Sequence, residues 1–273
     1  MTIKSILVNF DVGAFSPALL SIAVDLAERF RAELVGFAGA EPSAASFAGI
    51  DDGIAVVEAV VQERTAIEAS LQVIGEQFKA SVPGSIPSHW RGMILRPNRG
   101  LVGLARSADL VVVGSVLGRE AGPRFVDAGD LLLKLGRPAL LAGANGGKVR
   151  GDKIVVGWKD TREARRAISD ALPFLLNASD VFVVVVEEHD YSAEWASLKD
   201  VLRWLELQGV KARGEIVPLE TSPAETVVAA ARDMGADLIV AGAYGHSRMR
   251  EWLFGGVTQD LLAASTTNRF MSS

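Results

Sequence analysis

Three short segments recur in the same order in the two halves of this 273-residue chain. The matched pairs are Lys4-Ser-Ile-Leu-Val-Asn-Phe-Asp11 with Lys153-Ile-Val-Val-Gly-Trp-Lys159-Asp160, Trp90-Arg-Gly-Met-Ile-Leu95 with Ala212-Arg-Gly-Glu-Ile-Val217, and Ala108-Asp-Leu-Val-Val-Val-Gly114 with Ala236-Asp-Leu-Ile-Val-Ala-Gly242. Self-similarity in a fixed order indicates an internal duplication. The chain is therefore expected to fold as two copies of one structural unit.

A glycine-rich segment separates the two copies. The stretch Gly143-Ala-Asn-Gly-Gly-Lys-Val-Arg-Gly151 has the composition of a linker. We therefore expect one domain over 1–143 and a second over 152–273. Each would be long enough, at about 130 residues, to bury its own hydrophobic core.

Strand and helix patterns alternate in both halves. Ser16-Pro17 and Ser222-Pro-Ala-Glu225 are typical helix starts, with a capping serine followed by proline. The run Val183–Val186 is typical of a strand that is buried on both faces of a parallel sheet. Alternation of this kind predicts two tandem doubly wound α/β domains with parallel sheets. The expected strands are 5–10, 33–38, 89–95, 109–114, 153–158, 181–186, 212–218 and 237–242, and the clearest helices are those from 17, over 54–80 and over 223–234.

Composition narrows the function classes. The net charge of −5 argues against a nucleic-acid surface, which needs a clustered basic face. The absence of cysteine excludes disulfides and cysteine–zinc sites. The N-terminus goes directly into a strand pattern without a signal peptide, and no apolar run approaches ~18 residues. We expect a soluble, cytoplasmic protein without membrane contacts.

The second copy ends in a glycine pattern that suits phosphate binding. Gly242 and Gly245 follow a strand, and Gly255 and Gly256 open an apolar helix nine residues later. Backbone N–H groups at such a helix start can hold an anion without any basic side chain. Glycine permits the close approach, because a Cβ would block it. The pattern predicts a nucleotide site, although glycines after a strand are also ordinary turn formers.

The duplication, Asp11 and the Gly-x-x-Gly-(nine residues)-Gly spacing together resemble the universal stress protein family in its tandem two-domain form. The resemblance implies a five-stranded, Rossmann-like fold of the adenine nucleotide alpha hydrolase type in each half. It also implies ATP binding in some members, accompanied by Mg²⁺. There an aspartate after strand 1 and the backbone of strand 2 hold the adenine, while the glycines and a following Ser or Thr hold the phosphates and ribose.

In the second half, some positions match the family's binding residues and others depart from them. Gly256 stands where Ser or Thr is expected, and the next hydroxyl is that of Thr258. Lys159 takes the place of the adenine-side aspartate, with Asp160 one residue late. The nucleotide-binding residues implied by the resemblance are Gly242, Gly245, Gly255, Gly256, Val257, Thr258, Asp160 and Val186.

In the first half, the positions that correspond to these nucleotide-binding residues are only partly kept. It keeps Asp11 and Gly114, but Leu117 replaces the second glycine. Its helix start carries the bulky Phe125 together with Asp127 and Asp130, whose charges repel phosphate. We expect no ATP there.

Other charged side chains near the glycines allow either a phosphate-binding role or an ordinary surface role. Arg248 and Arg250 fit either a flap over phosphates or solvated loop charges, and His246 either a phosphate contact or a surface residue. The run Glu187-Glu-His-Asp190 lacks the spacing of a metal site.

The arginines of the second half's first helix are expected on a solvated face. Arg162, Arg165 and Arg166 lie opposite its apolar residues, and Arg166 is four residues from Asp170, which suits an ion pair.

No catalytic motif accompanies the glycines. The chain lacks the common phosphate-loop, dinucleotide and nucleophile-elbow patterns. We therefore expect a regulatory nucleotide-binding protein of the stress response. A nucleotide-free interaction scaffold and a slow ATPase stay open as alternatives. An adenine nucleotide and an unidentified protein are the expected partners. The resemblance implies that the fifth strands, 137–142 and 268–272, pair the halves as a pseudo-dimer, with a homodimer left open.

Overall fold

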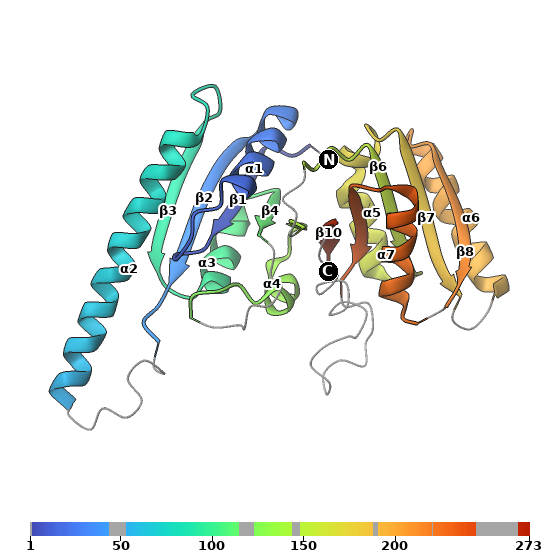
Figure 1. The fold of residues 1–273 in the computed structure, drawn as a ribbon. Coiled ribbons are helices and arrows are strands. Elements are labelled where there is room, and N and C mark those ends of the chain that lie inside the picture. Colours follow the sequence, from blue (N-terminus) through green and yellow to red (C-terminus); the bar gives the residue numbers. More distant parts are fainter. Residues whose placement is uncertain are drawn as a thin grey trace.

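We describe a computed structural model of the chain over residues 2–43, 53–114, 123–143, 148–187, 191–219, 221–243 and 267–273. Within these residues, strands from both halves join into one ten-stranded sheet with helices against it (Figure 1). The doubly wound α/β class expected from the sequence is confirmed. The limits 1–143 and 152–273 remain our proposal for the domains.

The expected strands of the first half are confirmed to within two residues. Its long helix is also confirmed, at one residue longer than expected at each end. The sequence did not predict three features of this half: the helix over 97–104, the short 3-10 helix that follows it, and the end of the helix that begins at 128. The elements are β1 (Ser5–Phe10), α1 (Pro17–Phe30), β2 (Glu33–Ala40), α2 (Gly53–Ser81), β3 (Ser88–Ile94), α3 (Pro97–Leu104), the 3-10 helix Ala105–Ser107, β4 (Leu110–Val113), α4 (Ala128–Leu135) and β5 (Ala139–Leu141).

The second half follows the same order where it is described. Its predicted strands are confirmed to within one residue, and so is the helix that begins after Ser222. The Ser222 hydroxyl accepts the Glu225 backbone N–H at 3.2 Å, as a capping serine should. The elements are β6 (Lys153–Trp158), α5 (Arg162–Leu175), β7 (Asp180–Glu187), α6 (Tyr191–Leu207), β8 (Ala212–Pro218), α7 (Pro223–Met234), β9 (Leu238–Gly242) and β10 (Asn268–Ser272).

The strand order of the sheet is a mirror repeat. It reads β3-β2-β1-β4-β5-β10-β9-β6-β7-β8, so that β6 to β10 repeat the order of β1 to β5 in reverse. Every pair is parallel except β5 with β10, which meet antiparallel at the seam between the halves. The expected pairing of the fifth strands therefore occurs within one chain.

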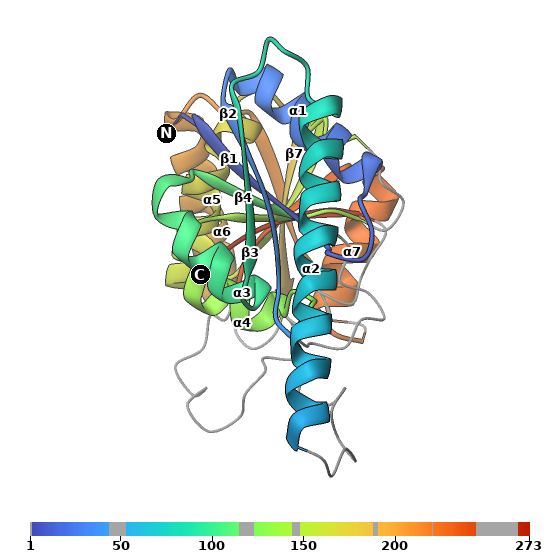
Figure 2. The ribbon, with the colours of Figure 1, turned by 90° about the vertical axis from the view of Figure 1, so that its left-hand side faces the viewer.

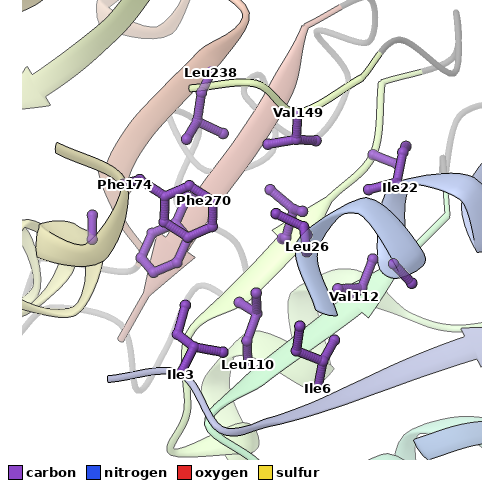
Figure 3. Packing of buried hydrophobic residues seen from close by; sticks show 14 of the residues in the cluster. Ile3, Ile6, Ile22, Leu26, Leu110, Val112, Val149, Phe174, Leu238 and Phe270 are labelled. Carbon is purple, nitrogen blue, oxygen red and sulfur yellow. The ribbon is translucent and has the colours of Figure 1, made fainter. Parts of the chain in front are cut away.

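Helices cover both faces of the sheet (Figure 2). The larger core lies beneath α1, α2, α5 and α6 and continues across the seam, where Phe174 of α5 meets Phe270 of β10 at 5.6 Å between ring centroids (Figure 3). Smaller cores lie beneath α3, α4 and α7. No helix in the described part of the chain is both long and apolar enough to cross a membrane.

Two of the repeated segments have a shared structural role. Asp109 precedes β4, and its carboxylate accepts the backbone N–H groups of Lys4 and Ser5 at 2.7 and 3.1 Å. Asp237 precedes β9, and its carboxylate accepts the N–H of Asp152 at 3.3 Å. Each aspartate thus holds the start of its half's central strand.

The repeated Arg-Gly pair lies in the two edge strands. A Cβ on Gly92 of β3 would lie 3.2 Å from Leu71 Cβ of α2, and one on Gly214 of β8 would lie 2.7 Å from Leu198 Cδ1 of α6. Glycine at both places lets the long helix of each half pack closely on its edge strand, and the contact is tighter at Gly214.

Polar contacts link α5 to the seam strand β10 and to the first half. The Ser272 hydroxyl donates to Asp170 at 2.9 Å, and Arg166 lies 3.6 Å from the same carboxylate. The expected Arg166–Asp170 pair is thus confirmed. The solvated-face interpretation is incomplete for Arg166, because its guanidinium also donates to the Gly136 carbonyl of the first half at 2.9 Å. Burial lowers the pKa of Arg269, in the seam strand β10, to about 10.

Candidate functional site

The carboxyl ends of β9, β6 and β7 lie side by side in the second half. In the sheet register, Gly157 of β6 pairs with Ala241 of β9, and Trp158 pairs with Val185 of β7. The predicted site residues Gly242, Asp160 and Val186 therefore come to one edge. The strand order reverses at β6, and ligands of doubly wound sheets bind at such a reversal.

Gly242 is glycine for a packing reason. A Cβ there would lie 2.6 Å from the backbone N of Ala164 and 2.7 Å from the backbone carbon of Glu163, in the first turn of α5. No side chain fits against backbone at that distance. The first glycine of the motif thus permits the close approach of α5 to β9, whatever else it does.

Asp160 and Val186 are directed away from each other. The exposed Asp160 carboxylate is ion-paired with Arg165 of α5. Val186 is partly buried and packs with Val184 and Val227 on the α7 side of the sheet. Lys159, which directly follows β6 and precedes Asp160, is exposed.

Trp158 is a residue that sequence reasoning missed. It is the last residue of β6, it is buried, and its indole N–H donates to the Ser197 hydroxyl of α6 at 2.9 Å. This hydrogen bond fixes α6 against the end of the central strand. A signal was present in the repeat, because Phe10 stands at the same position in the first half.

The remaining predicted residues lie outside the described part of the chain. They are Gly245, Gly255, Gly256, Val257 and Thr258, together with His246, Arg248, Arg250 and His189.

The family model described as the universal stress protein family matches residues 151–268. The second half of the chain belongs to the universal stress protein family.

Solved structures of this family share the fold of the whole chain. A universal stress protein from Archaeoglobus fulgidus has a TM-score of 0.68 at 14% identity, with 98% of each chain covered. A putative universal stress protein from Pseudomonas aeruginosa has a TM-score of 0.65 at 14% identity, with 99% of this chain and 93% of that chain covered. No curated protein matches the chain in sequence.

The first half presents a different carboxyl edge from its universal stress protein partner domain. Phe10, at the end of β1, stacks on Phe15 at 5.1 Å between centroids and lies 6.0 Å from Phe78 and 6.2 Å from Trp90. Aromatic side chains therefore fill the space between β1, α2 and β3. Asp11 follows Phe10, and its carbonyl accepts the Ala14 N–H at 3.2 Å in a tight turn.

Gly114, the counterpart of Gly242, is not sterically required. A Cβ there would meet only Leu19 Cδ2, at an ordinary 3.6 Å. The same position in the two halves thus has a different packing constraint, because α5 approaches its sheet more closely than α1 does.

The start of α4 is closed by the chain's own side chains. Asp127 lies thirteen residues after Gly114, as Gly255 does after Gly242 (127 − 114 = 255 − 242). Its carboxylate accepts the Asp130 N–H at 2.9 Å, and its own backbone N–H donates to the side-chain amide oxygen of Asn98 at 3.1 Å. Backbone donors that a phosphate would need are therefore already used, which supports the expectation of no ATP there.

Within the described ranges, no group of three His, Cys, Asp or Glu side chains gathers at either edge. Burial opposes ionisation of Asp130, but hydrogen bonds from Lys134 and Asn98 outweigh it and lower the pKa of that carboxyl. The Asp130 charge next to the α4 start therefore persists at neutral pH and would repel an anion.

Proposed function

We propose that this chain is a tandem stress-response protein whose second half binds ATP or a related adenine nucleotide as a regulatory ligand. The first half then acts as a structural partner that does not bind nucleotide. The observation that carries the proposal is the position of Gly242. It ends β9 next to the strand reversal at β6, and the sequence continues from it with the spacing to Gly245 and Gly255.

The connectivity suggests how occupancy acts as a signal. The residues of the glycine motif connect β9 to β10, and β10 pairs with both β9 and β5. A ligand held by this connection interacts with the segment that leads into the seam strand. We propose that nucleotide occupancy thereby changes a surface at the seam that a protein partner contacts.

Calorimetric titration of nucleotide-stripped protein with ATP and Mg²⁺ tests the proposal. We expect one site per chain, and no binding in Gly245→Val or Gly255→Val. Gly114→Ala is the matched control at the first-half edge, and it should bind as the unaltered chain does. Unchanged binding in both valine variants would contradict the assignment to the second half.

A nucleotide-free scaffold is the second candidate. Two observations favour it: Lys159 is exposed where an adenine-recognising carboxylate is expected, and the α5 backbone already occupies the space beside Gly242. This alternative predicts no heat of binding and no thermal stabilisation at millimolar ATP. The same titration therefore separates the two candidates.

A further inference from the structure

β8 is the outermost strand at one end of the sheet (Figure 1). Within the residues that the structure describes, its only strand neighbour is β7. An outer strand presents a row of backbone N–H and C=O groups that can pair with a strand of another chain. The side chains of β8 therefore decide which strand this edge can accept.

The two charged residues of β8 lie on the same face of the sheet. Gly214 faces α6, because a Cβ there would lie 2.7 Å from a leucine side chain of that helix. Successive side chains of a strand point to opposite faces, so Arg213 and Glu215 lie on the other face, where both are exposed. The Arg213 guanidinium lies 4.3 Å from the centroid of the Phe182 ring and 3.2 Å from the Asp180 carboxylate.

The spacing of these charges makes β8 complementary to a second copy of itself. In an antiparallel pair with a two-fold axis at Gly214, Arg213 of each copy stands opposite Glu215 of the other. Opposite charges in directly opposed positions stabilise a strand pair, and like charges destabilise it. The face that carries them has room for this pairing, because α7 packs mainly on β6, β7 and β9.

The outer strand of the first half lacks this complementarity. The repeat aligns the Arg-Gly pairs of β3 and β8, but Met93 of β3 stands where β8 has Glu215. Two β3 strands in the same arrangement would set Arg91 of each copy against Met93 of the other. The charge pattern therefore favours a second copy at β8 over one at β3.

Helix α6 carries an exposed aromatic side chain beside the same edge. Ser197 faces β6 through its hydrogen bond with Trp158. Trp195, two residues away, therefore lies on the opposite side of the helix, toward the outer edge, and is 43% exposed. Leu198, in the next turn, lies against Gly214, so Trp195 is within about one turn of the two-fold axis. Covering this aromatic surface would favour association.

We propose that β8 and α6 form a two-fold interface with a second copy of this chain. The two sheets then continue into each other through antiparallel β8 strands. Arg213 faces Glu215 twice, and the Trp195 side chains are covered between the two α6 helices. This interface is separate from the β5–β10 seam, which pairs the halves within one chain.

Analytical ultracentrifugation over a dilution series tests the inference. We expect the unaltered chain to form a dimer. Glu215→Arg places arginine opposite arginine, and Arg213→Glu places glutamate opposite glutamate, so each should weaken dimerisation about tenfold. An equimolar mixture of these two variants should regain most of the affinity, because opposite charges face each other again. Arg91→Glu, at the aligned position of β3, is the matched control and should leave the dimer unchanged.

Three results would overturn the inference. The first is a monomer at every concentration of the unaltered chain. The second is a dimer that Glu215→Arg leaves unchanged, because the copies would then meet at another surface. The third is a mixture of the two charge variants that stays as weak as each variant alone. A loss of folded structure at Arg213 cannot imitate the expected result, because mixing would not rescue it.

Trp195→Ala tests the part of the interface that α6 contributes. We expect it to weaken the dimer several-fold while the circular dichroism spectrum stays unchanged, because the side chain is exposed in the single chain. Unchanged dimerisation in this variant would overturn the role of α6.

Discussion

The two carboxyl edges of this molecule are built on the same strands and differ in what occupies them. In the first half, Phe10 packs into an aromatic cluster, and Asn98 and Asp127 satisfy the backbone donors at the start of α4. In the second half, Trp158 is held by α6, and Lys159 is exposed at the strand end. A duplicated fold can therefore close one ligand edge with its own side chains while the other keeps the glycine spacing.

The two halves share structural features away from this edge. The opposite ends of the central strands are held alike by Asp109 and Asp237, and the outer strands both carry a glycine beneath the long helix, at Gly92 and Gly214. These shared residues thus serve the construction of the sheet.

Substituting alanine for the glycine at the end of β9 should have the largest effect on the free energy of unfolding. Gly242→Ala places a Cβ 2.6 Å from backbone in α5, and we expect it to lower the free energy of unfolding by about 2–3 kcal/mol. Gly114→Ala, the matched change in the first half, should alter it by less than about 0.5 kcal/mol. Urea unfolding of both variants measures the difference. Equal losses would contradict the closer packing of α5.

Removing Asn98 should open the closed edge at a smaller cost. Asn98→Ala deletes the amide that donates to the Asp127 carbonyl at 2.8 Å and to the Asp130 carboxylate at 2.9 Å. We expect a loss of about 2 kcal/mol in unfolding free energy. Asn177→Ala removes a single exposed hydrogen bond to Pro173 and should cost about 0.5 kcal/mol. A loss no larger at Asn98 than at Asn177 would show that the closure of the α4 start is weak.

The smallest effect concerns the aspartate that holds β6. Burial raises the pKa of Asp237 above 3.8, so the folded state binds its proton more tightly than the unfolded chain does. The stabilisation by protonation is present at low pH and is lost as pH rises through the raised pKa. The free energy of unfolding should be measured for Asp237→Asn and for the unaltered chain as the pH rises through the raised pKa of Asp237. We expect the asparagine variant to become more stable relative to the unaltered chain as the pH rises. A difference that is constant with pH would contradict the raised pKa.

Much of the fold could be predicted from local signals. Val183–Val186 and the repeated apolar runs fixed the strands, and Ser16 and Ser222 marked helix starts by their capping chemistry. The helix α3 was not predicted, because eight residues containing two glycines carry a weak pattern. The bridge from Arg166 to Gly136 was also missed, since no sequence spacing reports a contact between residues of different halves.

The candidate site could be predicted only in part. The glycine spacing and the strand ends located the edge, because both follow from sequence order. Three contacts could not be predicted: the ion pair of Asp160 with Arg165, the hydrogen bond of Asn98 at the start of α4, and the hydrogen bond of Trp158 to α6. They depend on which side chains the sheet brings together, and that is set by tertiary packing.

The central claim is that only the second half holds a nucleotide. Photolabelling of the full chain with an azido-adenine analogue of ATP, followed by peptide mapping, tests it most directly. The account predicts ATP-competed label in peptides from residues 152–273 and none from residues 1–143. Competed label in the first half would contradict it.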